Sequence, residues 1–130
     1  MPATERALDI ALEAARAASS RKAVEIIALD VSERLVLTDV FLIASATNER
    51  QVSAIVDAVE EALHARGVKA LRREGVREAH WVLLDFGDVV VHVQHADDRI
   101  YYALERLWAD CPVIDLPPDA RGGDGTVETE

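Results

Sequence analysis

The residues best suited to chemistry in this 130-residue chain lie in one short stretch, HWVLLDFGDVVVHV, which runs from His80 to Val93. It holds Asp85, Asp88 and His92 within eight residues. Two carboxylates beside an imidazole could act as a general acid–base group, as in a hydrolase or a divergent nucleotidyltransferase. The same residues could instead shape a hairpin turn and pack within a strand. The pattern of the residues around them bears on this choice.

The stretch has the apolar character and central glycine of a β-hairpin over residues 81–94. With Phe86-Gly87 as a two-residue loop, Asp85 faces Asp88 across the turn. His92 then lies more than about 10 Å from Asp88 along the strand, because each residue of a strand advances about 3.3 Å. We therefore interpret the aspartates as turn residues that bond backbone N–H groups, and His92 as a packed histidine.

Other signatures of a metal or nucleotide site are weak. In the same register His92 faces Trp81, while His92 and His95 point to opposite faces of the strand and do not chelate one ion together. The small-residue turn ASATNE at 44–49 precedes a helix, which is a typical anion site. However, the chain has neither a G-x-G-x-x-G run nor a Walker lysine, and it lacks D-x-D and G-x-S-x-G motifs. We expect no metal, no cofactor and no catalytic residues.

Composition predicts a single globular protein that works in the cytoplasm. The lone cysteine, Cys111, excludes an internal disulfide and fits a reducing compartment. The N-terminal residues do not form a signal peptide, and no apolar run is long enough to cross a membrane. A net charge of −10 makes the chain a poor binder of nucleic-acid phosphates, so we expect little direct RNA contact and no membrane contact.

Periodicity predicts the elements that position the hairpin. Apolar residues at helical spacing predict helices over 4–19 and 48–66, and a last helix from Asp97 or Asp98 to Trp108. Strand-like runs occupy 23–29, 39–45 and 69–73, followed by the hairpin. This order indicates an α/β fold with a mixed five-stranded sheet and helices on both faces. Residues 1–114 form the predicted domain, and residues 115–130 form an acidic tail that we expect to be disordered.

Two groups of residues are suited to binding another protein. Phe86 places a large apolar side chain at the predicted turn tip, where exposure costs hydration. Arg99, Tyr102 and Arg106 recur along the last helix, off its main apolar stripe. Arginine and aromatic side chains are the usual anchors of protein interfaces. The pattern alone does not distinguish this role from simple packing of Phe86 and Tyr102 in the core.

Three segments together resemble one known family: IIALDVSERLVLTDVFLIASATNERQV, HWVLLDFGDVVVHV and DDRIYYALERLW. They contain the motifs LDV, TD, W-x-x-x-D-x-G-D-x-V-x-H and R-x-x-Y-x-L-E-x-L-W, and the likeness runs over residues 4–114. The chain is similar to the ribosomal silencing factor family, also called RsfS or Iojap. The resemblance implies a nucleotidyltransferase-like fold without transferase activity, in a homodimer. It further implies binding to the large ribosomal subunit through ribosomal protein L fourteen, which blocks joining of the small subunit and lowers translation when nutrients are scarce.

Carried over residue by residue, the resemblance assigns the partner contacts to six positions: Trp81, Asp85, Phe86 and Gly87 of the hairpin, with Arg99 and Tyr102 of the last helix. It leaves open whether Trp81 faces the partner or the neighbouring helix. Two other functions remain as alternatives. One is a divergent nucleotidyltransferase or hydrolase that uses the two aspartates and His92. The other is a dimeric adaptor with a different partner.

Overall fold

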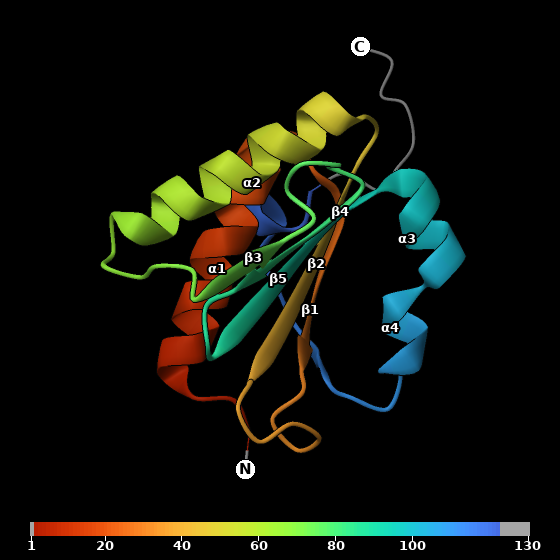
Figure 1. Cartoon of the computed structure of the whole chain (residues 1–130). Helices are drawn as coiled ribbons and strands as arrows, with labels where there is room; N and C mark the ends of the chain where they lie inside the picture. Colours follow the sequence, from red (N-terminus) through yellow and green to blue (C-terminus); the bar gives the residue numbers. More distant parts are fainter. Residues whose placement is uncertain (1, 123–130) are drawn as a thin grey trace.

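The structure is a computed structural model that describes residues 2–122, apart from the side chains of Tyr101 and Tyr102. A mixed sheet forms its centre, and helices lie on both faces of this sheet (Figure 1). The strands, in spatial order, are β3 (Arg72–Glu74), β4 (Trp81–Asp85), β5 (Val89–His95), β2 (Val40–Ala46), β1 (Val24–Asp30) and β6 (Val113–Ile114). The central pair β2–β5 is parallel, and the other neighbours are antiparallel. The predicted α/β class is confirmed, but the sheet has six strands rather than five, because the two-residue β6 is too short to leave a periodic signal.

The two long helices, α1 (Glu5–Ser20) and α2 (Glu49–His64), begin where their caps predict. The hydroxyl oxygen of Thr4 and the side-chain oxygen of Asn48 each accept the backbone N–H three residues further on, at 3.1 and 2.8 Å. Beyond the end of α2, Gly67 adopts a left-handed φ of +79°, as a glycine-terminated helix requires. Within the described residues, no helix is long and apolar enough to cross a membrane.

The face of the sheet beneath α1 and α2 holds the main core. Strand β2 is buried at every position, and β5 at every position except its last. Small side chains dominate the buried stripe of α1, which consists of Ala7, Ile10, Ala11, Ala14, Ala15 and Ala18. Larger aliphatic side chains dominate that of α2, which consists of Val52, Ile55, Val56, Ala58, Val59 and Leu63. The small residues allow α1 to approach its neighbours closely, while the larger ones fill the space above the sheet.

The opposite face carries two short helices, α3 (Ala96–Tyr102) and α4 (Leu104–Leu107), in place of the single helix predicted (Figure 1). The helix breaks at Ala103, whose backbone is left-handed with φ +47° and ψ +55°. The break redirects the chain, so the predicted apolar stripe does not face the sheet as a whole. Ile100 and Leu107, which belong to that stripe, are 78% and 67% exposed.

The β4–β5 hairpin has a register two residues away from the predicted one. Leu83, rather than Trp81, stands opposite His92. The two central residues of the turn are Gly87 and Asp88, and Gly87 has a φ of +91°. A positive φ is what a type II′ turn needs at its first central position. Because the shift is even, each predicted strand residue keeps its face of the sheet.

The shift changes the position of Phe86. Its N–H donates to the carbonyl oxygen of Val89 at 2.9 Å, so Phe86 ends the strand pairing instead of forming the loop. Its side chain packs into the core on the α2 side and is only 8% exposed. The predicted turn-tip position of Phe86 is therefore wrong, and its packing in the core, which the sequence left open, is what the structure shows.

The aspartates of the LDV and TD motifs hold the start of the chain against the end of the sheet. One carboxylate oxygen of Asp30 accepts the N–H of Ala3 at 2.9 Å, and Asp39 accepts the N–H of Thr4 at 3.0 Å. The other oxygen of Asp30 accepts the hydroxyl and the N–H of Ser32, at 2.6 and 3.0 Å. Burial raises the pKa of Asp30, but these hydrogen bonds outweigh it and leave the pKa below its ordinary value. Both motif aspartates thus have a structural role.

The chain after β6 stays in contact with the domain. A short 3-10 helix, η1 (Pro118–Ala120), lies against α1. Leu116 is 6% exposed, and Ala120 is fully buried in the main core. Residues 115–122 therefore belong to the packed domain, although the sequence assigned them to the acidic tail. The remainder of that predicted tail, residues 123–130, lies outside the described residues.

Candidate protein-binding face

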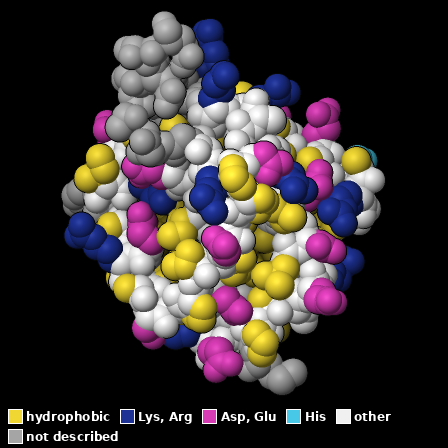
Figure 2. All heavy atoms as spheres, turned by 180° about the vertical axis from the view of Figure 1, so that it is seen from behind, with side chains coloured by type: hydrophobic (Ala, Val, Ile, Leu, Met, Phe, Trp, Pro, Cys, Tyr) yellow, Lys and Arg dark blue, Asp and Glu magenta, His cyan; other side chains and the backbone are white. Residues whose placement is uncertain are grey.

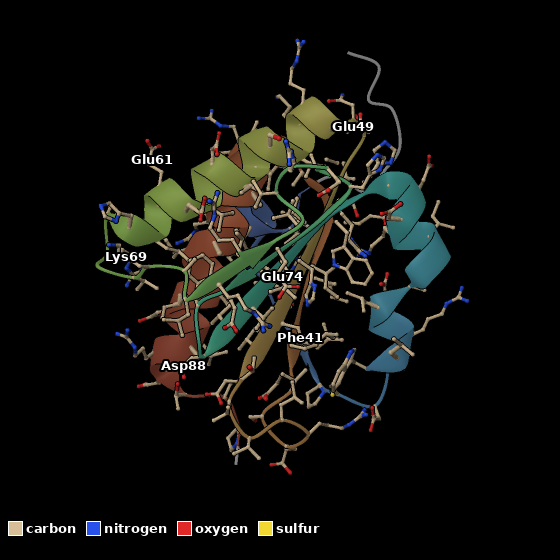
Figure 3. The ribbon with its side chains drawn as sticks, in the orientation of Figure 1. Phe41, Glu49, Glu61, Lys69, Glu74 and Asp88 are labelled. Atoms are coloured by element: carbon tan, nitrogen blue, oxygen red, sulfur yellow. The ribbon has the colours of Figure 1, made fainter. Side chains whose placement is uncertain are left out.

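The side of the sheet that carries α3 and α4 is the candidate site. These short helices leave several large apolar side chains half-buried around a small second core. We call this surface the open face, and its half-buried members are Ile27, Leu35, Trp81, Leu83 and Trp108. Figure 3 shows side chains filling the space between the sheet and α4, with Phe41 labelled among them. Large apolar groups that are neither fully buried nor isolated are typical of protein-binding surfaces.

Trp81 presents the largest side chain of β4 to the open face. It stands opposite Gln94 in the ladder and diagonally across from His92. Its indole Nε1–H donates to Nδ1 of His92 at 3.1 Å, and the His92 ring is itself only 5% exposed. The predicted packing of His92 is confirmed, and the neighbouring tryptophan is its hydrogen-bond donor. The buried His92 thus holds the N–H edge of the indole, while the rest of the half-buried Trp81 side chain remains part of the surface.

The aromatic contacts continue across the sheet as a row. Phe41 of β2 meets the His92 ring edge-on, with centroids 5.1 Å apart, and meets the Trp108 ring in the same manner at 5.0 Å. Beyond Trp108, the guanidinium carbon of Arg34 lies 4.6 Å from the indole centroid, within the range of a cation–π contact. The row begins at Trp81 and spans three strands of the sheet and the segment after α4. Sequence reasoning missed Phe41, because only the parallel pairing of β2 with β5 brings it beside His92.

The three candidate acid–base residues do not form one group. The carboxylate of Asp85 accepts the N–H of Gly87 at 2.8 Å, which confirms its predicted turn role. Asp88 lies on the side of α1, with its carboxylate 4.0 Å from Arg6 (Figure 3). The Nδ1 atom of His92 is occupied by the indole. Each of the three side chains therefore has a different partner.

Arg99 lies inside the molecule rather than on the surface of the last helix, where a partner contact was expected. It is 5% exposed. Its Nε donates to a carboxylate oxygen of Glu105 at 3.0 Å, and Nη1 donates to the hydroxyl oxygen of Ser45 at 2.7 Å. These bonds cross the break at Ala103 and fasten α3 and α4 to β2. The side chain of Tyr102, the other predicted contact on this helix, lies outside the described residues.

The polar layer beneath α3 and α4 is incompletely paired. Gln94 is fully buried, and neither atom of its side-chain amide has a hydrogen-bond partner. Nε2 of His92 and one carboxylate oxygen of Glu105 are also buried without a partner. Buried polar atoms are nearly always paired in folded proteins. In the part of the chain that the structure describes, these unpaired atoms all belong to the open-face side of the sheet, and sequence reasoning did not single out Gln94.

The burial of His92 makes folding stability depend on pH. Burial lowers the pKa of His92 from its ordinary value of 6.5 to about 4. The unfolded chain therefore takes up this proton first as the pH falls. The neutral, buried His92 ring therefore contributes about 3 kcal/mol to the free energy of unfolding above about pH 6.5. This contribution is lost as the pH approaches 4. We expect urea unfolding to show this loss between about pH 7 and pH 4.5, and a His92→Phe variant to lack it. An equal pH dependence in both proteins would contradict the assignment.

Comparison with known proteins gives consistent matches. A family model described as "Ribosomal silencing factor during starvation" (RsfS) matches residues 4–129. Ribosomal silencing factor RsfS of Bacillus subtilis is 44% identical over 103 residues, covering 79% of this chain and 87% of that protein. The same-named protein of Halalkalibacterium halodurans is 42% identical over 103 residues, covering 79% of this chain and 88% of that protein. A crystal structure of a Chromobacterium violaceum protein superposes with a TM-score of 0.76 at 37% identity, covering 78% of this chain and 85% of that one.

Proposed function

Because this chain belongs to the ribosomal silencing factor family, we propose that it is a ribosome-associated translational repressor that acts by binding. It binds the large ribosomal subunit through ribosomal protein L fourteen and occupies a surface that the small subunit needs. Joining of the subunits is thereby blocked, which slows translation under nutrient limitation. The mechanism is steric, so its strength depends on interface contacts rather than on bond chemistry.

The observation that carries this proposal is the aromatic row of the open face. Trp81 offers a large surface anchored from below by His92, and Leu83 and Trp108 extend the half-buried apolar surface on either side of the row. Tryptophan is among the residues that most often dominate binding energy in protein interfaces. The face thus has the composition of a binding surface.

Surface charge favours a basic partner. Side chains of both signs cover the molecule, and Figure 2 shows hydrophobic side chains exposed between them on the face opposite to that of Figure 1. The net charge of the whole chain is −10. An acidic protein associates more readily with a basic protein surface than with nucleic-acid phosphates. Ribosomal proteins are generally basic, which supports a protein rather than an RNA contact.

The geometry gives little support to the enzymatic alternative. A nucleotidyltransferase needs carboxylates that converge on a metal ion. Among residues 2–122, no group of three or more His, Cys, Asp or Glu side chains is placed to hold one. Asp85, Asp88 and His92 also have separate partners. We therefore propose a nucleotidyltransferase-like fold that serves for binding.

The six residues that the family resemblance suggested have different roles in this proposal. Trp81 makes the direct contact, and Tyr102 is a second proposed contact. Asp85 and Gly87 shape the turn, and Arg99 supports the surface from inside. Phe86 packs in the core on the other side of the sheet and holds the end of the hairpin in place. We further propose that the free protein is a homodimer in the cytoplasm, which light scattering of the purified protein and fractionation of cells will test.

We expect the purified protein to suppress joining of purified ribosomal subunits. On a sucrose gradient, the fraction of joined ribosomes should fall in proportion to the protein added, because each bound copy removes one large subunit from the joining reaction. The protein should co-sediment with isolated large subunits and not with small ones. Undiminished joining at saturating protein would refute the proposal. Clear Mg²⁺-dependent nucleotide binding would favour the enzymatic alternative instead.

A further inference from the structure

His92 lies beneath Trp81, the half-buried side chain proposed as the anchor of the open face. The indole Nε1–H of Trp81 donates to His92 Nδ1 at 3.1 Å, and the ring centroids are 6.1 Å apart. The two residues are diagonal neighbours on β4 and β5, a distance that large side chains bridge. The hydrogen bond therefore connects a half-buried side chain to a buried one on the next strand.

The His92 ring has little freedom to move. Its strand is paired on both sides, with β2 and with β4. The ring is 5% exposed and meets Phe41 edge-on, at a centroid distance of 5.1 Å and an interplanar angle of 73°. Side chains in such close-packed surroundings occupy single rotamers. His92 thus offers an acceptor whose position is fixed before any partner binds.

The hydrogen bond also requires one state of the ring. Nδ1 accepts a hydrogen bond only when the imidazole is neutral and its proton is on Nε2. Nε2 is buried, and within the described residues no carboxylate bonds to it, so these surroundings do not favour a charged ring. Burial lowers the pKa of His92 to about 4, so the ring stays neutral near pH 7. The acceptor is therefore present under the conditions in which ribosomes work.

We propose that His92 is a positioning residue, which holds the Trp81 indole through Nδ1 in the orientation that the partner protein meets. This inference rests on the proposed function, in which Trp81 contacts a ribosomal protein. Fixing a large side chain before binding reduces the ordering cost of association. Loss of this hydrogen bond should weaken binding about tenfold. A tenfold change in affinity corresponds to about 1.4 kcal/mol, which is at the upper end of the net contribution of one hydrogen bond.

Two amide substitutions at position 92 form a matched pair. Asparagine can place its side-chain oxygen near the position of Nδ1, whereas glutamine reaches toward the position of Nε2. We expect His92→Asn to bind isolated large subunits within about threefold of the parent, and His92→Gln to bind about tenfold more weakly. The indole N–H signal of Trp81 in NMR spectra should shift in His92→Gln and stay close to the parent position in His92→Asn. The chain has two tryptophans, so the signal missing in Trp81→Phe identifies the one to follow.

The Trp81→Phe variant supplies a test that does not depend on the folding of the amide variants. It keeps an aromatic ring but removes the N–H donor, so it should bind about tenfold more weakly than the parent. Parent-like binding by Trp81→Phe, or equal losses in His92→Asn and His92→Gln when both are folded, would overturn the positioning role. If the parent itself does not bind large subunits, the proposed function fails. In that case an unchanged indole signal in folded His92→Gln would separately overturn the positioning role.

Discussion

Replacing Trp81 with alanine is expected to weaken binding to isolated large ribosomal subunits about 30-fold, because an interface anchor of this kind contributes about 2 kcal/mol or more. The side chain is only half-buried in the free protein, so the domain should remain folded. Co-sedimentation at a series of protein concentrations measures the loss. The same variant should fail to suppress subunit joining at concentrations that suffice for the parent.

A matched control comes from the far edge of the sheet. Val113 on β6 is 65% exposed and lies at the opposite edge of the sheet from the hairpin. Val113 shares a side of the sheet with Leu29 and the open face, but it lies outside the aromatic row. Val113→Ala therefore removes exposed apolar surface without altering the row, so we expect parent-like binding. If Trp81→Ala binds as the parent does, or if both variants lose affinity equally, the aromatic row is not the specific contact.

Replacing Arg99 with alanine is expected to lower the free energy of unfolding by about 3 kcal/mol. The substitution leaves the carboxylate of Glu105, which is 32% exposed, without its cation, and it removes the bond that fastens α3 to Ser45. Breaking a fully buried ion pair from one side costs about 3–5 kcal/mol, and the partial exposure of Glu105 places this case at the low end. Urea unfolding at neutral pH measures the difference.

Arg106 supplies the control for that substitution, because it is an exposed arginine on the neighbouring α4. We expect Arg106→Ala to change stability by less than about 0.5 kcal/mol. The double variant Arg99→Met with Glu105→Leu should recover part of the loss, since neither charge then remains buried alone. Equal stability of Arg99→Ala and Arg106→Ala would show that the buried pair does not hold the helices.

Features that depend on neighbouring residues could be predicted from the sequence. Thr4 and Asn48 cap their helices and Gly67 follows the end of α2, because each acts within one turn of its own position. The apolar stripes of α1 and α2 follow from helical spacing alone. The α/β class, the mixed sheet and the coverage of both its faces follow from the order and burial of these elements.

The register of the β4–β5 hairpin could not be predicted from the hydrophobic pattern. Loops at Phe86-Gly87 and at Gly87-Asp88 give registers two residues apart, and side chains alternate faces with a period of two. Both registers therefore bury the same strand residues, and the hydrophobic pattern does not distinguish them. Only the choice of loop decides whether Phe86 is exposed or buried. Its burial removed one of the predicted contacts from the surface.

The candidate site depended on contacts between distant parts of the chain. Arg99 is buried because Ser45 and Glu105 converge on it, and Ser45 lies 54 residues earlier. The aromatic row similarly requires that β2 and β5 be neighbours in the sheet. Trp81 was singled out from the sequence, and its contact with a partner stays a prediction. The sequence could not show that α3 and α4 leave its side chain half-buried, because that depends on how much of the sheet they cover.

The parallel pairing of β2 with β5 also constrains how the chain folds. These two strands form the centre of the sheet, yet α2, β3 and β4 lie between them in the sequence. Contacts between residues so far apart form slowly, because the intervening segment must first be ordered. During synthesis, β5 leaves the ribosome only after β2, α2, β3 and β4. The central pair is therefore completed late, and a ribosome that translates this protein must make both partner strands and everything between them before the domain can assemble.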